Sequence, residues 1–183
     1  MIIIGITGTL GAGKGTIVDY LIEKHNYSHY SVREYITQEL INRNIPVDRD
    51  SMVVLANSLR SENSPSYIVE QLFEQAQKKG VNCIIESIRT PGEVDALRKK
   101  GNFILFAVDA NPELRYQRIV LRNSVTDNVS YETFLKNERR EMNSTDPNKQ
   151  NVSWCISHAD HTFQNNDDKE QLFSQIENII RKY

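Results

Sequence analysis

The sequence predicts a single α/β domain in which helices flank a mainly parallel sheet. Apolar, β-branched runs of strand length alternate along the chain with segments of helical periodicity. At 183 residues, the chain is long enough for one well-buried core but short for two full domains. Five of the eight glycines fall between positions 5 and 15, where the first strand-like run meets a helical pattern. This clustering predicts a tight turn with a special backbone geometry at that point.

The N-terminal half contains one clear strand and four helical segments. Residues 2–7 form an apolar, largely β-branched run, which is typical of a strand buried on both faces. Ile17, Leu21 and Ile22 recur at helical spacing behind the glycine cluster and predict the first helix. Three further helices are expected at residues 34–43, 51–61 and 65–79. The last of them ends at Gly80 after two lysines, which is a common signal for a helix C-terminus.

The C-terminal half continues the alternation of strands and helices. Strands are expected at residues 81–85, 103–108 and 161–164, each followed by a helical pattern. Thr90, Pro91 and Glu93 have the order of an N-cap, a first-turn proline and a reciprocating carboxylate, which predicts where the helix after the first of these strands begins. A further helix is expected at residues 131–142, and a turn-rich loop at 144–151.

Composition and charge exclude several classes of protein. The formal net charge is -2 and the sequence pI is about 6.1, so no overall positive field would recruit nucleic acid. No apolar stretch reaches the length of a bilayer span, and the four apolar residues at the start are too few for a signal sequence. The two cysteines lie far apart, which suits a reducing compartment. We expect a cytoplasmic protein that binds a small molecule and has neither a nucleic acid nor a membrane as partner.

A phosphate-binding loop is predicted between the first strand and the first helix. It consists of Gly8, Thr9, Leu10, Gly11, Ala12, Gly13, Lys14, Gly15 and Thr16. Glycines allow backbone N–H groups to turn inward around a phosphate, the helix start adds partial positive charge, and Lys14 adds a full charge. An ordinary glycine-rich turn does not require a lysine and a hydroxyl at these offsets. The pattern therefore predicts that the loop binds the phosphates of a nucleotide.

The spacing of the loop argues against a dinucleotide-binding fingerprint. The last glycine of that fingerprint would stand at position 16, whereas here it is Gly15, and Lys14 has no role in that motif. The strict phosphate-loop pattern places Ser or Thr directly after the lysine. Because Gly15 intervenes, Thr16 is the hydroxyl that we expect near Mg²⁺, either directly or through a water molecule.

Three motifs resemble the adenylate kinase branch of the nucleoside monophosphate kinases. Residues 13–16 (GKGT) have the order of that branch, and residues 84–89 (IIESIR) are similar to its strand-end Asp-Gly-Phe-Pro-Arg motif, with Glu86 in place of the aspartate. Residues 118–122 match its Arg-Ile-x-x-Arg at the entry of the lid. The whole chain is also similar to small adenylate-kinase-like or dephospho-coenzyme-A-kinase-like proteins. This resemblance implies a P-loop NTPase fold of three α/β/α layers, with a parallel five-stranded sheet and a short helical lid.

The resemblance also implies ATP as the phosphoryl donor and Mg²⁺ as a cofactor. Lys14 and the loop backbone would hold the donor phosphates, and Asn165 would lie near the donor adenine. Thr16 and Glu86 would organise Mg²⁺. The acceptor would contact Arg33, Tyr35, Arg60, Glu86 and Arg89, and Arg89 would grip the acceptor phosphate. The catalytic cations would be Lys14, Arg89, Arg118, Arg122 and Arg139.

One domain is expected over residues 1–183, with an acceptor-binding helical segment at about 33–80 and a lid at about 123–150. Two features depart from the family pattern. The arginine that usually follows the second strand is missing, and Arg33 and Arg60 are its candidate replacements. The lid has no cysteine cluster, which excludes a structural zinc there.

Three functions therefore remain open. The first is ATP-dependent phosphoryl transfer to a nucleoside monophosphate or a related small nucleotide. The second is a dephospho-coenzyme A kinase, which phosphorylates a ribose hydroxyl and needs an acid near the acceptor, such as Glu34 or Glu86. The third is an ATP-binding regulatory module with slow or no kinase activity. The missing family arginine favours the third, and the other arginines of the expected site disfavour it.

Overall fold

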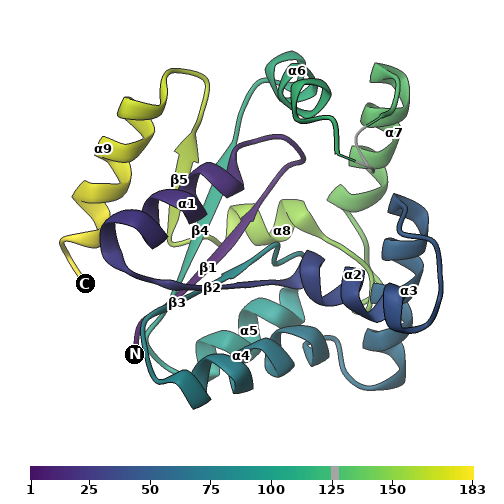
Figure 1. Cartoon of the computed structure of the whole chain (residues 1–183), viewed down its shortest axis with the longest axis horizontal. Coiled ribbons are helices and arrows are strands. Elements are labelled where there is room, and N and C mark those ends of the chain that lie inside the picture. The colour runs from purple at the N-terminus through teal and green to yellow at the C-terminus, as the bar shows by residue number, and fades with distance from the viewer. Residues whose placement is uncertain (125–127) are drawn as a thin grey trace.

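The computed structural model describes residues 1–124 and 128–183 and shows a parallel sheet between helical layers (Figure 1). Its strands are β1 (Ile3–Gly8), β2 (Ser28–Ser31), β3 (Cys83–Glu86), β4 (Phe103–Asp109) and β5 (His161–Gln164). They lie in the order β2-β3-β1-β4-β5, and every pairing is parallel. The predicted three-layer α/β fold with a parallel five-stranded sheet is confirmed.

Helices connect the strands and cover both faces of the sheet. In the described residues they are α1 (Lys14–His25), α2 (Val32–Asn42), α3 (Arg49–Glu62), α4 (Tyr67–Lys79), α5 (Pro91–Lys99), α6 (Pro112–Arg122), α7 (Tyr131–Met142), α8 (Val152–Ser157) and α9 (Lys169–Ile180). The short helix α8 is absent from the sequence-based expectations, because six residues are too few to show helical periodicity. None of these helices is long and apolar enough to cross a membrane.

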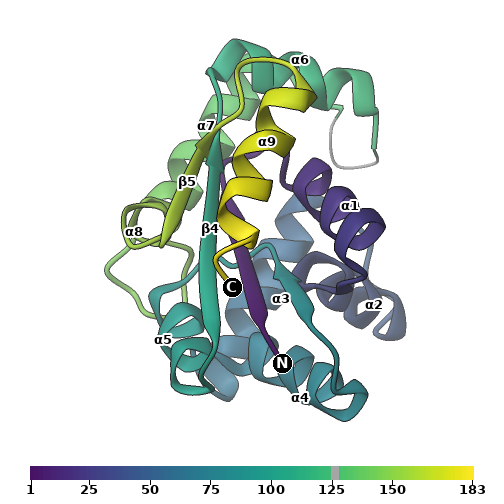
Figure 2. The ribbon, with the colours of Figure 1, turned by 90° about the vertical axis from the view of Figure 1, so that its left-hand side faces the viewer.

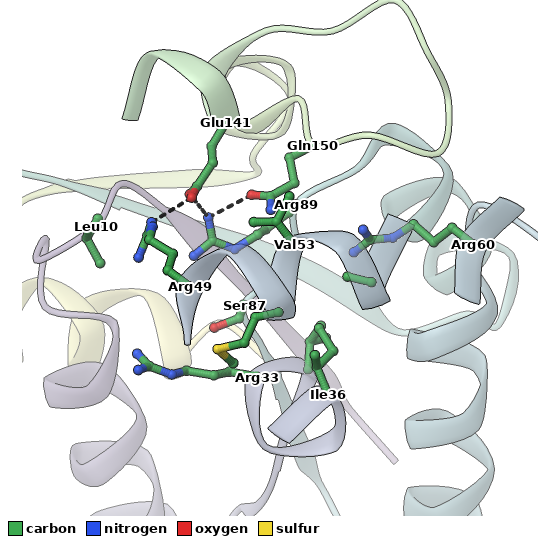
Figure 3. Close-up of a pocket in the computed structure, with 13 residues that line it drawn as sticks. Leu10, Arg33, Ile36, Arg49, Val53, Arg60, Ser87, Arg89, Glu141 and Gln150 are labelled. Carbon is green, nitrogen blue, oxygen red and sulfur yellow. Dashed lines mark hydrogen bonds and ion pairs between the residues drawn. The ribbon is translucent and has the colours of Figure 1, made fainter. Parts of the chain in front are cut away.

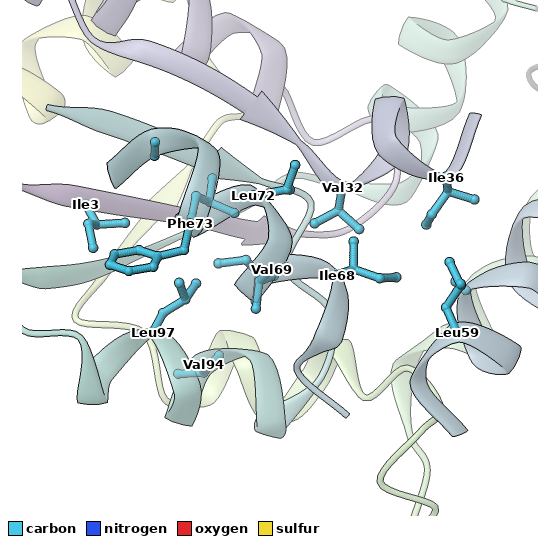
Figure 4. Packing of buried hydrophobic residues seen from close by; sticks show 14 of the residues in the cluster. Ile3, Val32, Ile36, Leu59, Ile68, Val69, Leu72, Phe73, Val94 and Leu97 are labelled. Atoms are coloured by element: carbon cyan, nitrogen blue, oxygen red, sulfur yellow. The ribbon is translucent and has the colours of Figure 1, made fainter. Parts of the chain in front are cut away.

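Alternate residues of the central strand β1 face the two halves of the core. Ile3 belongs to a buried cluster with side chains of α2, α3, α4 and α5 (Figure 4). Ile4 and Ile6 belong to a second cluster with side chains of α1 and α9, two helices that lie side by side on the other face (Figure 2). A strand that is buried on both faces reads as a continuous apolar run, as residues 2–7 do.

The chain leaves the adjacent strands β1 and β3 toward opposite faces of the sheet. The helix after β1, α1, packs into one core cluster, and the helix after β3, α5, packs into the other. In open parallel sheets, ligands bind in the crevice at the carboxyl ends of strands that diverge in this way. The fold therefore brings the predicted phosphate loop next to the segment that follows Glu86.

A buried ion pair joins α3 to the start of α5. Arg60 Nη2 lies 2.8 Å from Glu93 Oε1, and the two side chains are 1% and 0% exposed. Glu93 Oε2 also accepts hydrogen bonds from the backbone N–H groups of Arg89 (2.8 Å) and Thr90 (3.1 Å), and the predicted capping box of α5 is present. One carboxylate therefore caps a helix, neutralises a buried charge and fixes the backbone of Arg89.

Replacing Glu93 with Ala is expected to lower the free energy of unfolding by about 3–5 kcal/mol, because Arg60 would stay buried without its partner. Urea unfolding followed by circular dichroism measures the loss. The matched control is Glu39→Ala, which breaks the ion pair between Glu39 and Arg43. This pair is more exposed than the pair of Arg60 and Glu93, so its loss should cost less than about 1 kcal/mol. Similar small losses in both variants would contradict the role given to the buried pair.

Both cysteine thiols are buried, and burial raises the pKa of Cys83 to about 11 and that of Cys155 to about 12. At pH 8 the reactive thiolate is then about one part in a thousand or less. We expect neither cysteine of the native chain to react with an aromatic disulfide reagent within minutes, whereas both react after unfolding in guanidinium. Rapid release of the reagent's chromophore from the native chain would refute this expectation.

Candidate active site

The loop that follows β1 has a backbone shape that requires glycine. Gly8, Gly11 and Gly13 have φ angles of 141°, 80° and 104°. A Cβ atom at Gly8 would lie 2.1 Å from the carbonyl oxygen of Val108, and one at Gly11 would lie 2.4 Å from that of Arg115. Any other side chain at these positions would force backbone to move. The loop is therefore held in one shape against β4 and α6.

Polar side chains from two other segments bond to the carbonyl groups of the loop. Arg115 Nη1 on α6 donates to the carbonyl oxygen of Leu10 at 3.2 Å. Asn165 Nδ2, directly after β5, donates to the carbonyl oxygen of Ala12 at 2.8 Å. These two bonds hold the carbonyl groups of Leu10 and Ala12 in place and so help to fix the shape of the loop.

Lys14 is the first residue of α1, and its ammonium group lies over the loop. Nζ donates to the carbonyl oxygens of Gly8 (3.0 Å) and Thr9 (2.8 Å). Burial and the nearby charge of Arg89, partly opposed by Glu86, together lower the pKa of Lys14 to about 7. A bound anion would offset the positive charges of Lys14 and the nearby Arg89 and so stabilise the charged form of Lys14. The loop and Lys14 together therefore suit a phosphate group.

A wide cleft of about 1870 Å³, part of which is open solvent, lies beside the loop. It gathers residues from the loop, α1, α2, the end of β3 and α6. The predicted site residues that line it are Leu10, Gly11, Gly13, Lys14, Gly15, Thr16, Arg33, Glu86, Arg89, Arg118 and Arg122. The structure therefore brings most of the expected donor site into one place.

Arg118 on α6 presents a hydrogen-bond donor to this cleft. Its Nη1 atom is buried and has no hydrogen-bond partner within residues 1–124 and 128–183, and burial lowers its pKa. Buried polar atoms nearly always have a partner. Arg122 follows one turn later on the same helix and lines the same cleft. A phosphate in the cleft would supply the missing acceptor.

Glu86 ends β3 at the edge of the cleft and is ionised. Burial raises its pKa, but the nearby imidazole of His29 and the positive charge of Lys14 outweigh this, so its pKa lies below the usual range. Glu86 Oε2 lies 3.4 Å from His29 Nε2, and Ser87 Oγ donates to Oε1 at 3.2 Å. In the described part of the chain, no three His, Cys, Asp or Glu residues gather into a metal site. Mg²⁺ here would take most of its ligands from phosphates and water, as this ion commonly does.

A second cavity of about 560 Å³, also partly open to solvent, adjoins the cleft (Figure 3). Helices α2 and α3 give it an apolar wall formed by Val32, Ile36, Met52, Val53 and Ala56. The cleft and the cavity share four lining residues: Leu10, Arg33, Ser87 and Arg89. Two molecules bound in the two spaces would therefore meet beside Arg89.

Glu141 on α7 bridges two arginines in the second cavity. Its Oε1 lies 2.6 Å from Arg49 Nη2, and its Oε2 lies 2.6 Å from Arg89 Nη1 (Figure 3). Gln150 Oε1 accepts a further bond from Arg89 Nη1 at 3.1 Å. Burial raises the pKa of Glu141, but the two arginines more than offset it, and the net pKa lies below the usual range. The carboxylate is therefore ionised and fixes the position of Arg89.

Two residues predicted to bind the acceptor have other tasks in the structure. Tyr35 lines neither space: its ring packs against the core, and burial together with a hydrogen bond to Tyr67 raises its pKa to about 12. Arg60 does line the second cavity, but its charge is compensated by Glu93. The structure therefore does not bring Tyr35 to either space, because α2 turns its ring toward Tyr67 at the start of α4.

The structure does not bring Arg139, an expected catalytic residue, to either space. Arg139 is exposed on α7 and lines neither space, because the helix turns Glu141 inward instead. Its neighbour Arg140 points outward as well, with Nη1 2.7 Å from Asp50 Oδ1. Within the expected lid, α7 forms as predicted, and residues 125–127 lie outside the described residues.

Two residues predicted to bind the donor use their side chains to hold the loop. Thr9 Oγ1 donates to Asp109 Oδ1 at 2.6 Å, and the Asn165 amide bonds to Ala12 as described above. A Cβ atom at Gly13 would lie 2.2 Å from the same Asn165 amide nitrogen. Both side chains are therefore used to hold the loop in shape. At these positions it is the loop backbone, and not the two side chains, that we expect to contact a phosphate.

Sequence patterns did not reveal several residues at the junction of the two spaces. Ser87 lines both and has a φ angle of 71°, a left-handed conformation that is uncommon outside glycine and often found at functional sites. Nothing in the sequence marks a serine for that conformation. Arg49, Glu141 and Gln150 come from separate segments, and no local spacing connects them.

Known proteins are similar to this chain over nearly its whole length, some in sequence and some in structure. A UPF0200 protein from Methanococcus vannielii is 25% identical over 185 residues, which cover 100% of this chain and 96% of that protein. The UPF0200 protein MJ1399 from Methanocaldococcus jannaschii is 26% identical over 100% of this chain and 90% of its own. The crystal structure of TT1252 from Thermus thermophilus matches with a TM-score of 0.64 and 19% identity, over 99% of this chain and 97% of that one. A shikimate kinase from Bacteroides thetaiotaomicron matches with a TM-score of 0.57 and 12% identity, over 98% of each chain.

A family model described as an AAA domain matches residues 4–143. The matched region contains the phosphate loop, the end of β3 and α6, so it includes most of the residues that line the cleft. Its extent is more than half of the chain. The chain belongs to the AAA domain family and has a P-loop NTPase-like fold.

Proposed function

We propose that the protein transfers the γ-phosphoryl group of ATP to a nucleoside monophosphate or a related small nucleotide, in the manner of adenylate-kinase-like enzymes. The observation that carries this proposal is the junction of the two spaces at Arg89 and Ser87. A kinase must hold two substrates with their reacting ends together. A module that only binds a nucleotide has no need of a second cavity beside its phosphate loop.

On the donor side, the backbone of residues 8–15 and Lys14 hold the β- and γ-phosphates. Asn165 supports this side by fixing the loop through Ala12. Thr16 and Glu86 both line this cleft, and they are the residues that would hold Mg²⁺. When bound, that ion neutralises phosphate charge and orients the phosphate oxygens.

In the transfer step, an oxygen of the acceptor attacks the γ-phosphorus of ATP. The bond between that phosphorus and the β–γ bridging oxygen breaks, and ADP leaves with the electron pair. Negative charge is spread over the transferring group, so nearby fixed cations lower the barrier. Arg89 at the junction and Arg118 and Arg122 on α6 supply those cations, because all three line the cleft.

The assignment of segments follows from the positions of the two spaces. We assign residues 33–80 to acceptor binding, because α2 and α3 form the apolar wall of the second cavity. Residues 123–150 act as a lid within a single domain of residues 1–183. We place the reaction in the cytoplasm. ATP is present there, and a reducing compartment suits two cysteines that form no disulfide.

A coupled assay of ADP release, run over nucleoside monophosphates, deoxynucleoside monophosphates and dephospho-coenzyme A, tests the proposal. Phosphoryl transfer to a nucleoside monophosphate supports it. Transfer to dephospho-coenzyme A alone would identify a dephospho-coenzyme A kinase instead. ADP release that depends on no acceptor would identify a nucleotide-binding regulatory module.

Lys14→Ala should abolish turnover and weaken binding of Mg·ATP by about tenfold or more, because the loop loses the amino group that contacts the donor phosphates. Isothermal titration calorimetry measures the affinity. Lys24→Ala is the matched control: it removes an exposed lysine from the last turn of the same helix and should leave affinity unchanged. Full activity in Lys14→Ala would remove the loop from the mechanism.

Arg89→Ala should lower kcat/KM by about 10³-fold, near 4 kcal/mol in the barrier, while ATP affinity stays close to that of the native chain. The reason is that Arg89 lies where the two substrates meet and not against the loop alone. Steady-state kinetics with the acceptor found in the assay measure the loss. Arg43→Ala, which removes a surface arginine directly after α2, is the control. Activity within tenfold of the native value in a folded Arg89→Ala variant would exclude the residue from catalysis.

A further inference from the structure

The guanidinium group of Arg115 joins three segments of the chain. Arg115 lies in the first turn of α6, and its side chain is 3% exposed. Nε donates to the carbonyl oxygen of Ala110 at 2.7 Å, and Nη1 donates to that of Leu10 at 3.2 Å. Nη1 and Nη2 also bind the two carboxylate oxygens of Glu138 on α7. One buried group therefore connects the phosphate loop directly to α7.

The charge of Arg115 depends on α7 for most of its compensation. Glu138 forms a bidentate pair with the guanidinium group, whereas Asp109 lies 3.6 Å from Nε and also accepts a hydrogen bond from Thr9. A buried arginine that loses a well-placed carboxylate is strongly destabilised. The packing of α7 against α6 therefore stabilises the position of Arg115, and with it the bond to Leu10.

That bond fixes the orientation of a peptide group in the phosphate loop. The carbonyl of Leu10 and the N–H of Gly11 belong to one planar trans peptide, so this N–H points away from Arg115. The side chain of Leu10 packs with Ile119 and Phe134, which ties the same stretch of loop to α6 and α7. A change in the position of α7 would therefore reach the loop backbone that we expect to bind phosphate.

The same face of α7 also reaches the second cavity. Phe134, Glu138 and Glu141 are spaced four and three residues apart, so they lie along one face of the helix. Cζ of Arg115 lies 5.4 Å from the centroid of the Phe134 ring, and Glu141 Oε2 lies 2.6 Å from Arg89 Nη1. Helix α7 thus contacts the support of the loop at one turn and Arg89 at the next.

We propose that Arg115 and Glu138 are positioning residues that couple the phosphate loop to Arg89 through α7. A polyphosphate bound to the loop stabilises the packed position of α7, and the packed helix strengthens phosphate binding, because a coupling between two sites acts in both directions. Neither Arg115 nor Glu138 is among the described residues that line the cleft or the second cavity, so both act through other groups. The inference rests on the proposed function in taking a nucleoside triphosphate as the ligand of the loop.

Hydrogen–deuterium exchange of the full chain, followed by mass spectrometry of its peptides, tests the coupling. Mg·AMP-PNP should slow exchange in α7 of the native chain several-fold. In Glu138→Gln this slowing should be lost, and the affinity for Mg·AMP-PNP, measured by calorimetry, should fall about fivefold or more. If the pair only stabilised α7, the ligand would still slow the exchange of that helix in the variant.

Glu132→Gln is the matched control for this experiment, because it makes the same substitution at an exposed position of the same helix. It should keep both the slowing of α7 exchange and the affinity of the native chain. Native-like slowing or native-like affinity in Glu138→Gln would overturn the inference.

A double-mutant cycle shows whether the two residues act as one unit. Arg115→Met removes the bond to Leu10 together with the ion pair, so it should weaken Mg·AMP-PNP at least as much as Glu138→Gln does. The variant with both substitutions should bind no more weakly than Arg115→Met alone. Losses that add would overturn the inference. Thermal unfolding shows whether each variant is folded, and Glu138→Gln decides alone if Arg115→Met is not.

The ligand-free chain separates this inference from the proposed function. Failure of Mg·AMP-PNP to bind the native chain would count against the proposed function, and the inference is then decided without ligand. Glu138→Gln should speed exchange several-fold in residues 9–18, which include the hydrogen-bonded amides of Ala12 and Ile17, whereas Glu132→Gln should not. Equal exchange of this segment in the two variants would overturn the inference.

Discussion

The backbone of residues 8–13 is the constraint on which the rest of the site depends. Gly8 and Gly11 leave no room for a Cβ atom against the carbonyl oxygens of Val108 and Arg115. Because β4 and α6 approach the loop so closely at these two glycines, the shape of the loop and the packing of the fold around it depend on each other. The register that sets Gly8 opposite Val108 is therefore as important to the site as the glycines themselves.

A single buried carboxylate makes the second connection between core and site. Glu93 neutralises Arg60, caps α5 and accepts the backbone N–H of Arg89. The guanidinium group of Arg89 is in turn bound by the side chains of Glu141 and Gln150. Arg89 is thus fixed at both its backbone and its guanidinium, at the point where the cleft and the second cavity meet. Such preorganisation is what phosphoryl transfer requires of a protein, since the chemistry itself needs positioning and charge neutralisation.

The sequence predicts what depends on near neighbours in the chain, and misses what depends on distant ones. The apolar run of β1, the capping box at Thr90 and the glycine spacing of the loop are all local patterns, and the structure contains each of them. The pairing of Arg49 with Glu141 joins residues 92 positions apart, so no spacing could indicate it. Arg139 shows the same dependence on distant contacts. Its charge suggested a role in the site, but the rotation of α7 about its axis decides which side chains turn inward. That rotation is set by the packing of Phe134.

Whether the two adjoining spaces form a phosphotransferase can be decided by following the γ-phosphorus of ATP. The protein is mixed with Mg·ATP labelled in that position and with a pool of small organic anions, and the products of a single turnover are separated. The arrangement of Arg89 between the cleft and the cavity predicts that the label appears in an organic phosphate, and that Arg89→Ala suppresses this product without preventing ATP from binding. Label found only in ATP and inorganic phosphate would contradict the assignment of the second cavity to an acceptor.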